Sequence, residues 1–226
     1  MIKVITFDLD DTLWSVWPII ATAELRLHEW LEQRYPRITA AHTPESLRML
    51  CRDIARERPE IAHDKTRLRL DALRRVADQQ GYPQALAEPA FEVFYAARND
   101  VVFYPDVLPA LTDLARDHTL GALSNGNADV TRCGLGQLVS FHFHAIGVGR
   151  EKPDPAMFKA TLARTGAAAH EIVHVGDDPQ HDIEGALNAG FHAIWVNRKA
   201  EIWNQTFQPH VTIHDLSTLR TAIERL

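Results

Sequence analysis

The chain has 226 residues, of which 46% are hydrophobic and 24% charged, a composition typical of a folded globular protein that excludes collagen-like, disordered and membrane-embedded classes. Its formal net charge is −6 and no long run of lysine and arginine occurs, so we expect no nucleic acid partner. No apolar run reaches the about 20 residues of a membrane span, and the start of the chain does not resemble a signal peptide. With only Cys51 and Cys133, the sequence favours reduced thiols, so we expect a cytoplasmic protein without a membrane partner.

The first predicted element is a short buried strand over residues 2–7, a mostly apolar run rich in β-branched side chains. It ends abruptly at the acidic segment Asp8-Leu9-Asp10-Asp11-Thr12. A buried strand that is followed at once by carboxylates delivers polar groups to its carboxyl end. We therefore expect Asp8 and Asp10 at the edge of a sheet.

The stretch from about Pro18 to Ala97 has helical spacing, as in Leu25, His28 and Leu31, and it lacks strand signals. Prolines punctuate it into about four or five helices that are joined by short turns. These prolines are Pro36, Pro44, Pro59, Pro83 and Pro89.

After Tyr104 the chain alternates between strand-like and helix-like segments. The apolar, strand-like runs are residues 120–123, 145–148, 172–175 and 193–196, and the helical stretches are residues 108–116, 156–165 and 182–189. Strand, helix, strand with short connections predicts a parallel sheet that is covered by helices on both faces. We therefore predict an α/β fold with a doubly wound parallel core, made of residues 1–14 and 100–226, and a helical insertion of residues 15–99.

Ligands of an open parallel sheet bind outside the carboxyl ends of its strands, so the residues at those ends are the candidate site. Here they are carboxylates, a hydroxyl and an amide, joined by one lysine from a connecting loop. The set is Asp8 and Asp10 after the first strand, Ser124 and Asn125 after the second, Asp177 after the fourth, and Lys152 before the helix at residues 156–165.

The paired aspartates suit phosphoryl transfer. Asp8 can attack phosphorus as a nucleophile, while Asp10 can protonate the leaving alkoxide and later deprotonate the hydrolytic water. A carboxylate and a phosphate dianion repel each other, so a cation is needed, and Mg²⁺ is the hard, oxygen-seeking candidate. Asp8, the backbone carbonyl of Asp10, and Asp177 can supply its oxygen ligands.

The remaining candidates suit the phosphate group. Ser124 and the backbone N–H groups around Asn125 can hold the non-bridging oxygens, and Lys152 can neutralise charge on the phosphate and the nucleophile. Each element also has a simpler interpretation: the acidic segments as turns or helix caps, Ser124-Asn125-Gly126 as a turn, and Lys152 as a solvated loop cation. Their order and placement together favour function.

These residues resemble the four motifs of the haloacid dehalogenase-like hydrolase superfamily. Asp8 to Thr12 is similar to the first motif, Ser124-Asn125 to the second, Lys152 to the third, and Gly176 to Asp182 to the fourth. The resemblance implies a Rossmann-like core, a Mg²⁺ cofactor, Asp8 as nucleophile and Asp10 as acid/base. It also implies that Asp177 is a direct metal ligand, that Asp182 supports Lys152 or metal-bound water, and that the insertion is a small α-helical cap.

The superfamily also contains dehalogenases and phosphomutases. Dehalogenases need no metal and lack an acid/base aspartate two residues after the nucleophile, so Asp10 disfavours that reaction, whereas a phosphomutase acting on a sugar phosphate stays open. Residues 59–67, 125–127 and 134–136 resemble bacterial phosphatases that act on flavin mononucleotide and on the phosphoribitylamino-pyrimidine intermediate of riboflavin biosynthesis. We therefore expect a small-molecule phosphate ester as substrate. The alternative of another class is a catalytically silent binding or regulatory module.

Four further residues have two interpretations each. Trp14 and Trp17, near the predicted hinge, can stack on a flat heterocycle or fill the seam between cap and core, and the second is favoured. His63 and Arg67, if both are helical, are i,i+4 neighbours that can contact a substrate tail or form a solvated face. His174 lies in an apolar strand and is interpreted as a satisfied core imidazole. The sequence does not predict an oligomeric state.

Overall fold

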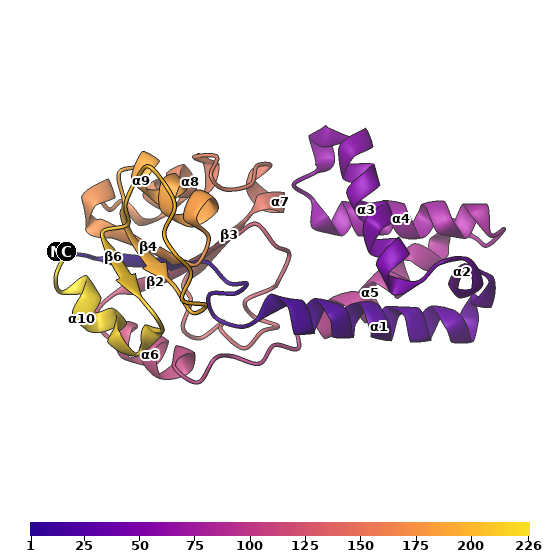
Figure 1. Ribbon diagram of the computed structural model, residues 1–226, viewed down its shortest axis with the longest axis horizontal. Coiled ribbons are helices and arrows are strands. Elements are labelled where there is room, and N and C mark those ends of the chain that lie inside the picture. Colours follow the sequence, from indigo (N-terminus) through magenta and orange to yellow (C-terminus); the bar gives the residue numbers. More distant parts are fainter. The chain divides into compact units, whose positions relative to one another are not determined.

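The computed structural model describes residues 1–226 and divides into two compact units. One comprises Met1–Ser15 and Val102–Leu226 and contains all the strands, and the other is the helical segment Val16–Val101 (Figure 1). The structure sets the boundaries at 15/16 and 101/102 rather than at 14/15 and 99/100. The role of the helical unit as a cap stays a prediction.

The sheet unit contains six strands in the order β3-β2-β1-β4-β5-β6, and all neighbours are parallel. The strands are β1 (Val4–Phe7), β2 (Thr119–Ser124), β3 (Phe141–His144), β4 (Ile172–Gly176), β5 (His192–Val196) and β6 (Val211–Ile213). The strand order reverses at β1, which pairs with β2 on one side and β4 on the other, so a topological switch point lies at its carboxyl end. The predicted Rossmann-like α/β fold is confirmed.

Helices cover both faces of this sheet (Figure 1). On one face lie α6 (Val107–Leu114) and α10 (Leu219–Ile223), and on the other lie α8 (Ala156–Thr165) and α9 (Gly185–Asn188). Every residue of β1 and β4 is buried, as expected for central parallel strands that are packed on two sides. Short 3₁₀ turns occur at Ala169–Glu171 and Leu216–Thr218.

The helical unit has five α-helices, in line with the proline punctuation. They are α1 (Val16–Arg34), α2 (Pro36–Ala41), α3 (Pro44–Glu57), α4 (Lys65–Gln79) and α5 (Ala87–Arg98), with 3₁₀ turns at Pro59–Ile61 and Gln84–Leu86. Proline stands at the start of α2 and α3, where its missing N–H costs nothing. Thr43 caps α3 and Asp64 caps α4, each by accepting a hydrogen bond from a first-turn N–H. The unit has its own apolar core.

The predicted strand at residues 145–148 is wrong, because this run is the short helix α7 (Ala145–Val148). The strand is β3, immediately before it, whose alternating Phe and His residues place the Phe141 and Phe143 rings 5.5 Å apart. Phe141 fits because Gly121 faces it: a Cβ atom there would lie 2.2 Å from the ring. The His144 side chain then accepts a hydrogen bond from Gly147 N (3.1 Å) and caps α7.

Two further elements differ from expectation. The predicted helix at residues 182–189 begins as a π-helical turn, Pro179–Glu184, and continues as α9. Asp178 caps this turn by accepting hydrogen bonds from the Gln180 and His181 N–H groups. Strand β6 was not predicted, because its three residues are too short for a pattern.

The structure also bears on three of these side chains. Trp14 is fully buried and belongs to the sheet unit, whereas Trp17 belongs to the helical unit, and a role for either ring in a seam stays a prediction. His63 precedes the cap of α4, so it does not form an i,i+4 helical pair with Arg67.

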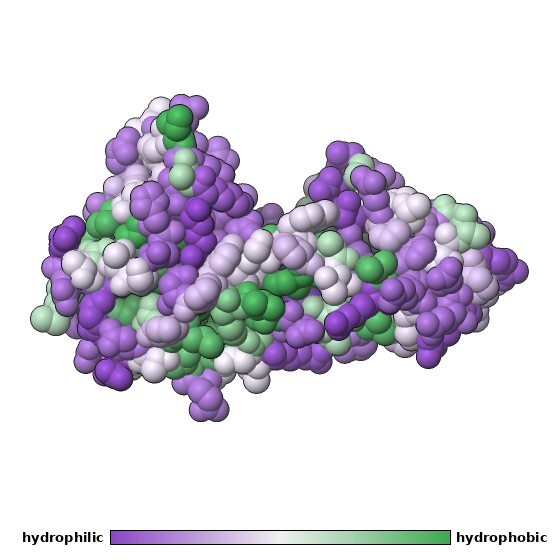
Figure 2. Space-filling view, turned by 60° about the horizontal axis from the view of Figure 1, so that its bottom comes forward, coloured by the Kyte–Doolittle hydropathy of each residue, from purple (hydrophilic) through white to green (hydrophobic).

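The surface is mainly hydrophilic on the face drawn in Figure 2, where hydrophobic residues form separate patches. No helix is both long enough and apolar enough to cross a membrane.

Candidate active site

The candidate site lies where β1, β2 and β4 end. Strand register aligns Phe7 with Ala122 and with Val175, so the residues that follow these strands meet at one edge of the sheet. Asp8 comes first after β1, and its backbone N–H donates to the Val175 carbonyl (2.9 Å). Its side chain is therefore held at the switch point, and the residue is only 8% exposed.

Lys152 is the buried cation of the site. Its Nζ lies 2.8 Å from Asp8 Oδ1, 2.6 Å from Asp182 Oδ1 and 2.5 Å from the Leu123 carbonyl oxygen. These contacts use all three N–H donors of an ammonium. Burial alone would lower the pKa of Lys152, but the charges of Asp182 and Asp8 outweigh it and raise the pKa, so the amine stays protonated. The interpretation of Lys152 as a solvated loop cation is therefore wrong.

The Asn125 side chain forms hydrogen bonds with both the N–H and the carbonyl group of the Lys152 backbone. Its side-chain NH₂ donates to the Lys152 carbonyl (3.0 Å), and its Oδ1 accepts from the Lys152 N–H (2.7 Å). The Asn125 side chain is thus engaged in fixing this loop. Ser124, almost fully buried, accepts a hydrogen bond from Gly126 N (3.0 Å), so its own hydroxyl proton is available for another acceptor.

Asp182 pairs with Lys152, and its carboxylate oxygens have three partners in the chain. Its Oδ1 contacts Lys152 and lies 3.2 Å from His174 Nε2, while its Oδ2 accepts from the Asp178 N–H (3.0 Å). Burial raises the pKa of Asp182, but Lys152 and His174 outweigh it and hold the pKa well below the usual range. Asp182 therefore stays ionised opposite the ammonium.

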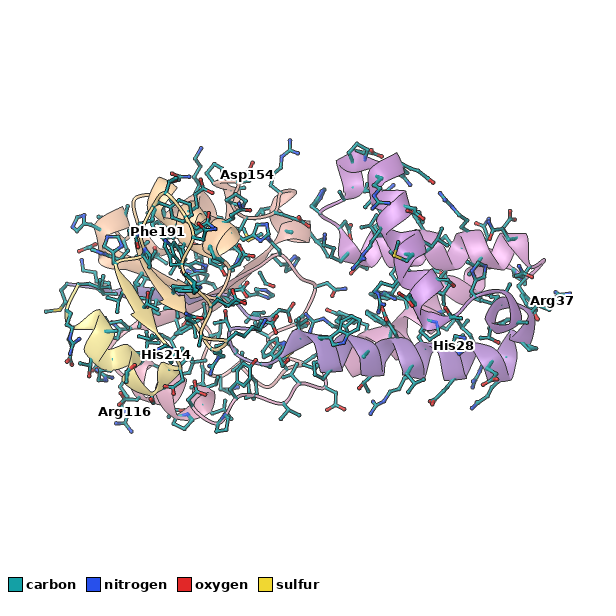
Figure 3. All side chains as sticks on the ribbon, in the orientation of Figure 1. His28, Arg37, Arg116, Asp154, Phe191 and His214 are labelled. Atoms are coloured by element: carbon teal, nitrogen blue, oxygen red, sulfur yellow. The ribbon has the colours of Figure 1, made fainter.

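His174 is part of this buried network and not only a core imidazole. Burial lowers its pKa, so the ring is neutral, and the carboxylate at Nε2 assigns the proton to that nitrogen. Nδ1 then accepts from the Thr6 hydroxyl (2.9 Å). Phe158 packs edge-on against this ring, and Phe191, labelled in Figure 3, packs edge-on against Phe158.

Asp10 is oriented by Trp14, a residue that sequence reasoning placed only at a hinge. The indole Nε1–H donates to Asp10 Oδ1 (2.9 Å), and the ring packs edge-on against Phe103 at 5.6 Å. The tight loop between them passes through Asp11 at a left-handed φ of 59°. The only sequence signal for this contact is a tryptophan four residues after the acid.

Asp177, after β4, is fixed by two hydrogen bonds. Thr12 Oγ1 donates to its Oδ1 (2.8 Å), and Trp195 Nε1 donates to its backbone carbonyl (2.7 Å). Burial and the nearby charge of Asp182 raise the pKa of Asp177 to about 7. Burial also raises the pKa of Asp8 well above its usual value, although Lys152 opposes the shift.

Three carboxylates form a cluster in which one oxygen from each of Asp8, Asp177 and Asp182 lies within 4.8 Å of the others. Asp182 is already engaged through both oxygens. Asp8 and Asp177 each keep one oxygen, Oδ2, that accepts no hydrogen bond from the chain. Such hard oxygen donors fit Mg²⁺. The backbone carbonyl of Asp10 as a further donor stays a prediction.

The fold and these side chains together define an α/β enzyme with an aspartate-rich site at the switch point. The chain belongs to the haloacid dehalogenase-like hydrolase family, whose model matches residues 2–190. The resemblance that the four motifs indicated is thereby confirmed, and the protein is a hydrolase.

Individual relatives carry both phosphatase and dehalogenase names. The chain is 30% identical to the 5-amino-6-(5-phospho-D-ribitylamino)uracil phosphatase YigB of Escherichia coli K12, over 98% of this chain and 96% of the relative. It is 34% identical to a phosphoserine phosphatase of Thermus thermophilus, over 60% of this chain and 57% of that protein. A crystal structure described as a 2-haloacid dehalogenase from Pseudomonas syringae pv. Tomato DC3000 is 41% identical, with a TM-score of 0.94 over 100% of this chain and 99% of that one.

Proposed function

We propose that this hydrolase is a Mg²⁺-dependent phosphatase that cleaves a small-molecule phosphate monoester through an aspartyl-phosphate intermediate on Asp8. The observation that carries the proposal is the meeting of Asp8, Lys152 and Asp177 at one sheet edge, with one oxygen of each carboxylate left without a hydrogen bond from the chain. Asp8 and Asp177 would hold the metal. When bound, Mg²⁺ would neutralise the repulsion between these carboxylates and the phosphate dianion.

Asp8 performs the first step. Lys152 holds the Asp8 carboxylate through Oδ1. A bond from one carboxylate oxygen of Asp8 to phosphorus forms as the bond from phosphorus to the ester oxygen breaks, and the leaving alkoxide takes a proton from the Asp10 carboxyl. In the second step the Asp10 carboxylate removes a proton from water, which attacks the phosphorus, releases phosphate and restores Asp8.

Lys152 and Ser124 stabilise the transferring group. The ammonium balances charge that builds on the equatorial oxygens, and the Ser124 hydroxyl donates a hydrogen bond to one of them. Asn125 contributes by holding the backbone of Lys152 in place, so we propose a positioning role for its side chain.

A dehalogenase is the second candidate, because the 41% identical structure carries that name. The Asp10 side chain argues against it. A departing halide needs no proton, whereas an alkoxide does, and here an acid stands two residues after the nucleophile and is held by Trp14.

The deciding experiment compares the two reactions in one preparation. We expect phosphate release from p-nitrophenyl phosphate with Mg²⁺, loss of it with EDTA, and no chloride release from 2-chloropropionate. Chloride release without added metal, together with no phosphate release, would establish the dehalogenase instead. Full phosphatase activity in Asp8→Asn would disprove the covalent mechanism.

For the substrate we propose a ribityl phosphate, either the phosphoribitylamino-pyrimidine of riboflavin biosynthesis or flavin mononucleotide. Support comes from the near full-length relative that is named for the first of these. A panel of both compounds with phosphoserine, a sugar phosphate and a nucleoside monophosphate, ranked by kcat/KM, tests this. We expect a ribityl phosphate to rank first; a tenfold preference for any other member would contradict it.

A further inference from the structure

The hydrogen bond that orients Asp177 continues away from the site. Thr12, which is fully buried, donates its hydroxyl to Asp177 Oδ1 (2.8 Å), and its backbone carbonyl accepts from Arg198 Nε (3.1 Å). The proposed metal ligand is thus connected through a single residue to a guanidinium on the loop after β5.

The far side of the same guanidinium is held by Asp106 in a bidentate pair. Arg198 Nη1 and Nη2 lie 3.1 and 2.7 Å from the two carboxylate oxygens of Asp106, and Asp106 also accepts a hydrogen bond from Leu216 N (2.8 Å). The guanidinium carbon lies 4.0 Å from the centre of the Tyr104 ring. The Arg198 side chain is only 13% exposed, so these contacts are shielded from solvent.

Arg198 also has a rigid base. The Asn197 side chain bonds to both the N–H and the carbonyl of Glu201 (2.8 and 2.9 Å), and its backbone N–H donates to the Ile213 carbonyl (2.7 Å). The ring of His214, labelled in Figure 3, lies 3.3 Å from the Asn197 carbonyl oxygen. The guanidinium therefore projects from a loop that is pinned to β6.

The three partners of Arg198 lie next to the boundaries between the units, on both segments of chain that connect them. Thr12 lies just before the chain leaves the sheet unit after Ser15, and Tyr104 and Asp106 lie just after it returns at Val102. The segments are also joined directly, since Tyr104 N donates to the Leu13 carbonyl (3.0 Å). One side chain thus holds both connecting segments and the residue that orients Asp177.

We propose that Arg198 is a positioning residue of the metal site: it holds Thr12, and through it the Asp177 carboxylate, in the geometry that binds Mg²⁺. This rests on the proposed function only in taking Asp177 as a metal ligand. A lysine cannot replace the planar fork, because one ammonium cannot serve both oxygens of Asp106 and the Thr12 carbonyl with the same geometry.

The test measures metal binding directly, in the full chain, with Mn²⁺ as an EPR-visible substitute for Mg²⁺. We expect Arg198→Lys to weaken Mn²⁺ binding about tenfold, the scale of losses when the outer partners of metal ligands are removed. Thr12→Val should weaken binding at least as much. Because Arg198 acts through Thr12, the double variant should bind Mn²⁺ like Thr12→Val alone.

Arg220→Lys is the matched control. Arg220 pairs with Asp113 and Asp117 in the same unit and contacts none of the site residues, so its loss should lower stability without changing Mn²⁺ affinity. Asp106→Asn, a milder change on the other side of the pair, serves if Arg198→Lys folds poorly, and it should weaken binding in the same direction.

The outcomes separate this inference from the proposed function. Wild-type Mn²⁺ affinity in both Arg198→Lys and Asp106→Asn, or additive losses in the double variant, would overturn the role of Arg198. A wild-type protein that binds Mn²⁺ but hydrolyses no phosphate ester would contradict the proposed function, while the variant series would still decide the role of Arg198.

Discussion

At the scale of single residues, Lys152 is the most consequential side chain of the site. It separates two buried carboxylates, Asp8 and Asp182, which would face each other without it. We expect Lys152→Met to abolish phosphatase activity and to lower the free energy of unfolding by about 3 kcal/mol, because a buried charge loses its partner. Urea denaturation and phosphate release measure the two effects. Lys159→Met, at an exposed position of α8, is the control and should change neither.

Asp10 and Trp14 give a graded pair of variants. Asp10→Asn should slow hydrolysis of an alkyl phosphate by about 10²- to 10⁴-fold, the range for loss of a general acid, and that of p-nitrophenyl phosphate less, since nitrophenolate leaves without a proton. Trp14→Phe removes only the N–H that orients Asp10. We therefore expect a smaller loss of rate on both esters, again larger on the alkyl phosphate than on p-nitrophenyl phosphate. Steady-state rates on the two esters check this. Equal losses on both esters would count against an acid role.

The raised pKa values of Asp8 and Asp177 make metal binding depend on pH. Burial raises the pKa of both carboxyl groups, so each binds its proton more tightly in the metal-free native state than in the unfolded chain. Their contribution to stability is therefore full in acid and is lost, for Asp177, as pH rises through about 7. Mg²⁺ competes with the proton of Asp177, and displacement of this one proton should raise the apparent Mg²⁺ affinity about tenfold per unit of pH up to pH about 7.

The measurement for this prediction is the Mg²⁺-induced rise in Tm from pH 5.5 to 8.5. Asp177→Asn, which has no proton to displace at this position, should remove most of the pH dependence. A Mg²⁺ effect that is constant over this range in the wild type would show that Asp177 holds no proton that Mg²⁺ displaces.

At the scale of elements, local sequence patterns predict the order of most strands and helices. They do not always predict whether a given apolar segment forms a strand or a helix. Residues 145–148 are as apolar as a strand, but two hydrogen bonds, from Gly147 N to the His144 ring and from Gly149 N to the Ala145 carbonyl, define a helical turn there. The bond to His144 depends on where β3 ends, which depends in turn on Phe141 packing against Gly121, a contact with another strand. Local periodicity does not contain such information.

The residues of the candidate site also fall into two groups, those that local patterns predict and those that they do not. The placement of Asp8, Ser124, Lys152 and Asp177 was predictable because each ends a strand, follows a strand or precedes a helix whose pattern is clear. The residues that hold them could not be predicted, since Thr12, Trp14, His174 and Arg198 act through contacts that tertiary packing creates. A hydrogen bond between residues 12 and 198 leaves no trace in the spacing of either.

The contact between Phe141 and Gly121 is itself testable. Gly121→Ala should lower the free energy of unfolding by about 2 kcal/mol, because the added methyl would clash with the ring and force β3 to shift. In a Phe141→Ala background the same substitution should cost much less. Urea denaturation of the wild type, the two single variants and the double variant gives the coupling free energy between the two positions. Equal costs in both backgrounds would contradict this packing arrangement.

At the scale of the whole molecule, we propose that the sheet unit carries out the chemistry and that the helical unit selects the substrate. All proposed catalytic and metal-binding residues belong to the sheet unit. If the helical unit selects the substrate, Arg67→Ala should change the ranking of phosphate esters by kcat/KM more than it changes the Mg²⁺ requirement. Arg56→Ala, another exposed arginine of the helical unit, is the control. Equal losses on every ester in Arg67→Ala would contradict a role in selectivity.

The pairing of Trp14 with Phe103 brings the two ends of the helical insertion together within the sheet unit. A segment whose ends are already adjacent adds little closure entropy, and the cost grows only slowly with its length. Modules of different size or sequence can therefore be exchanged at these joints while Asp8 and its partners stay in place. If the helical unit selects the substrate, evolution can replace this unit to change the substrate while the sheet unit keeps its proposed chemistry.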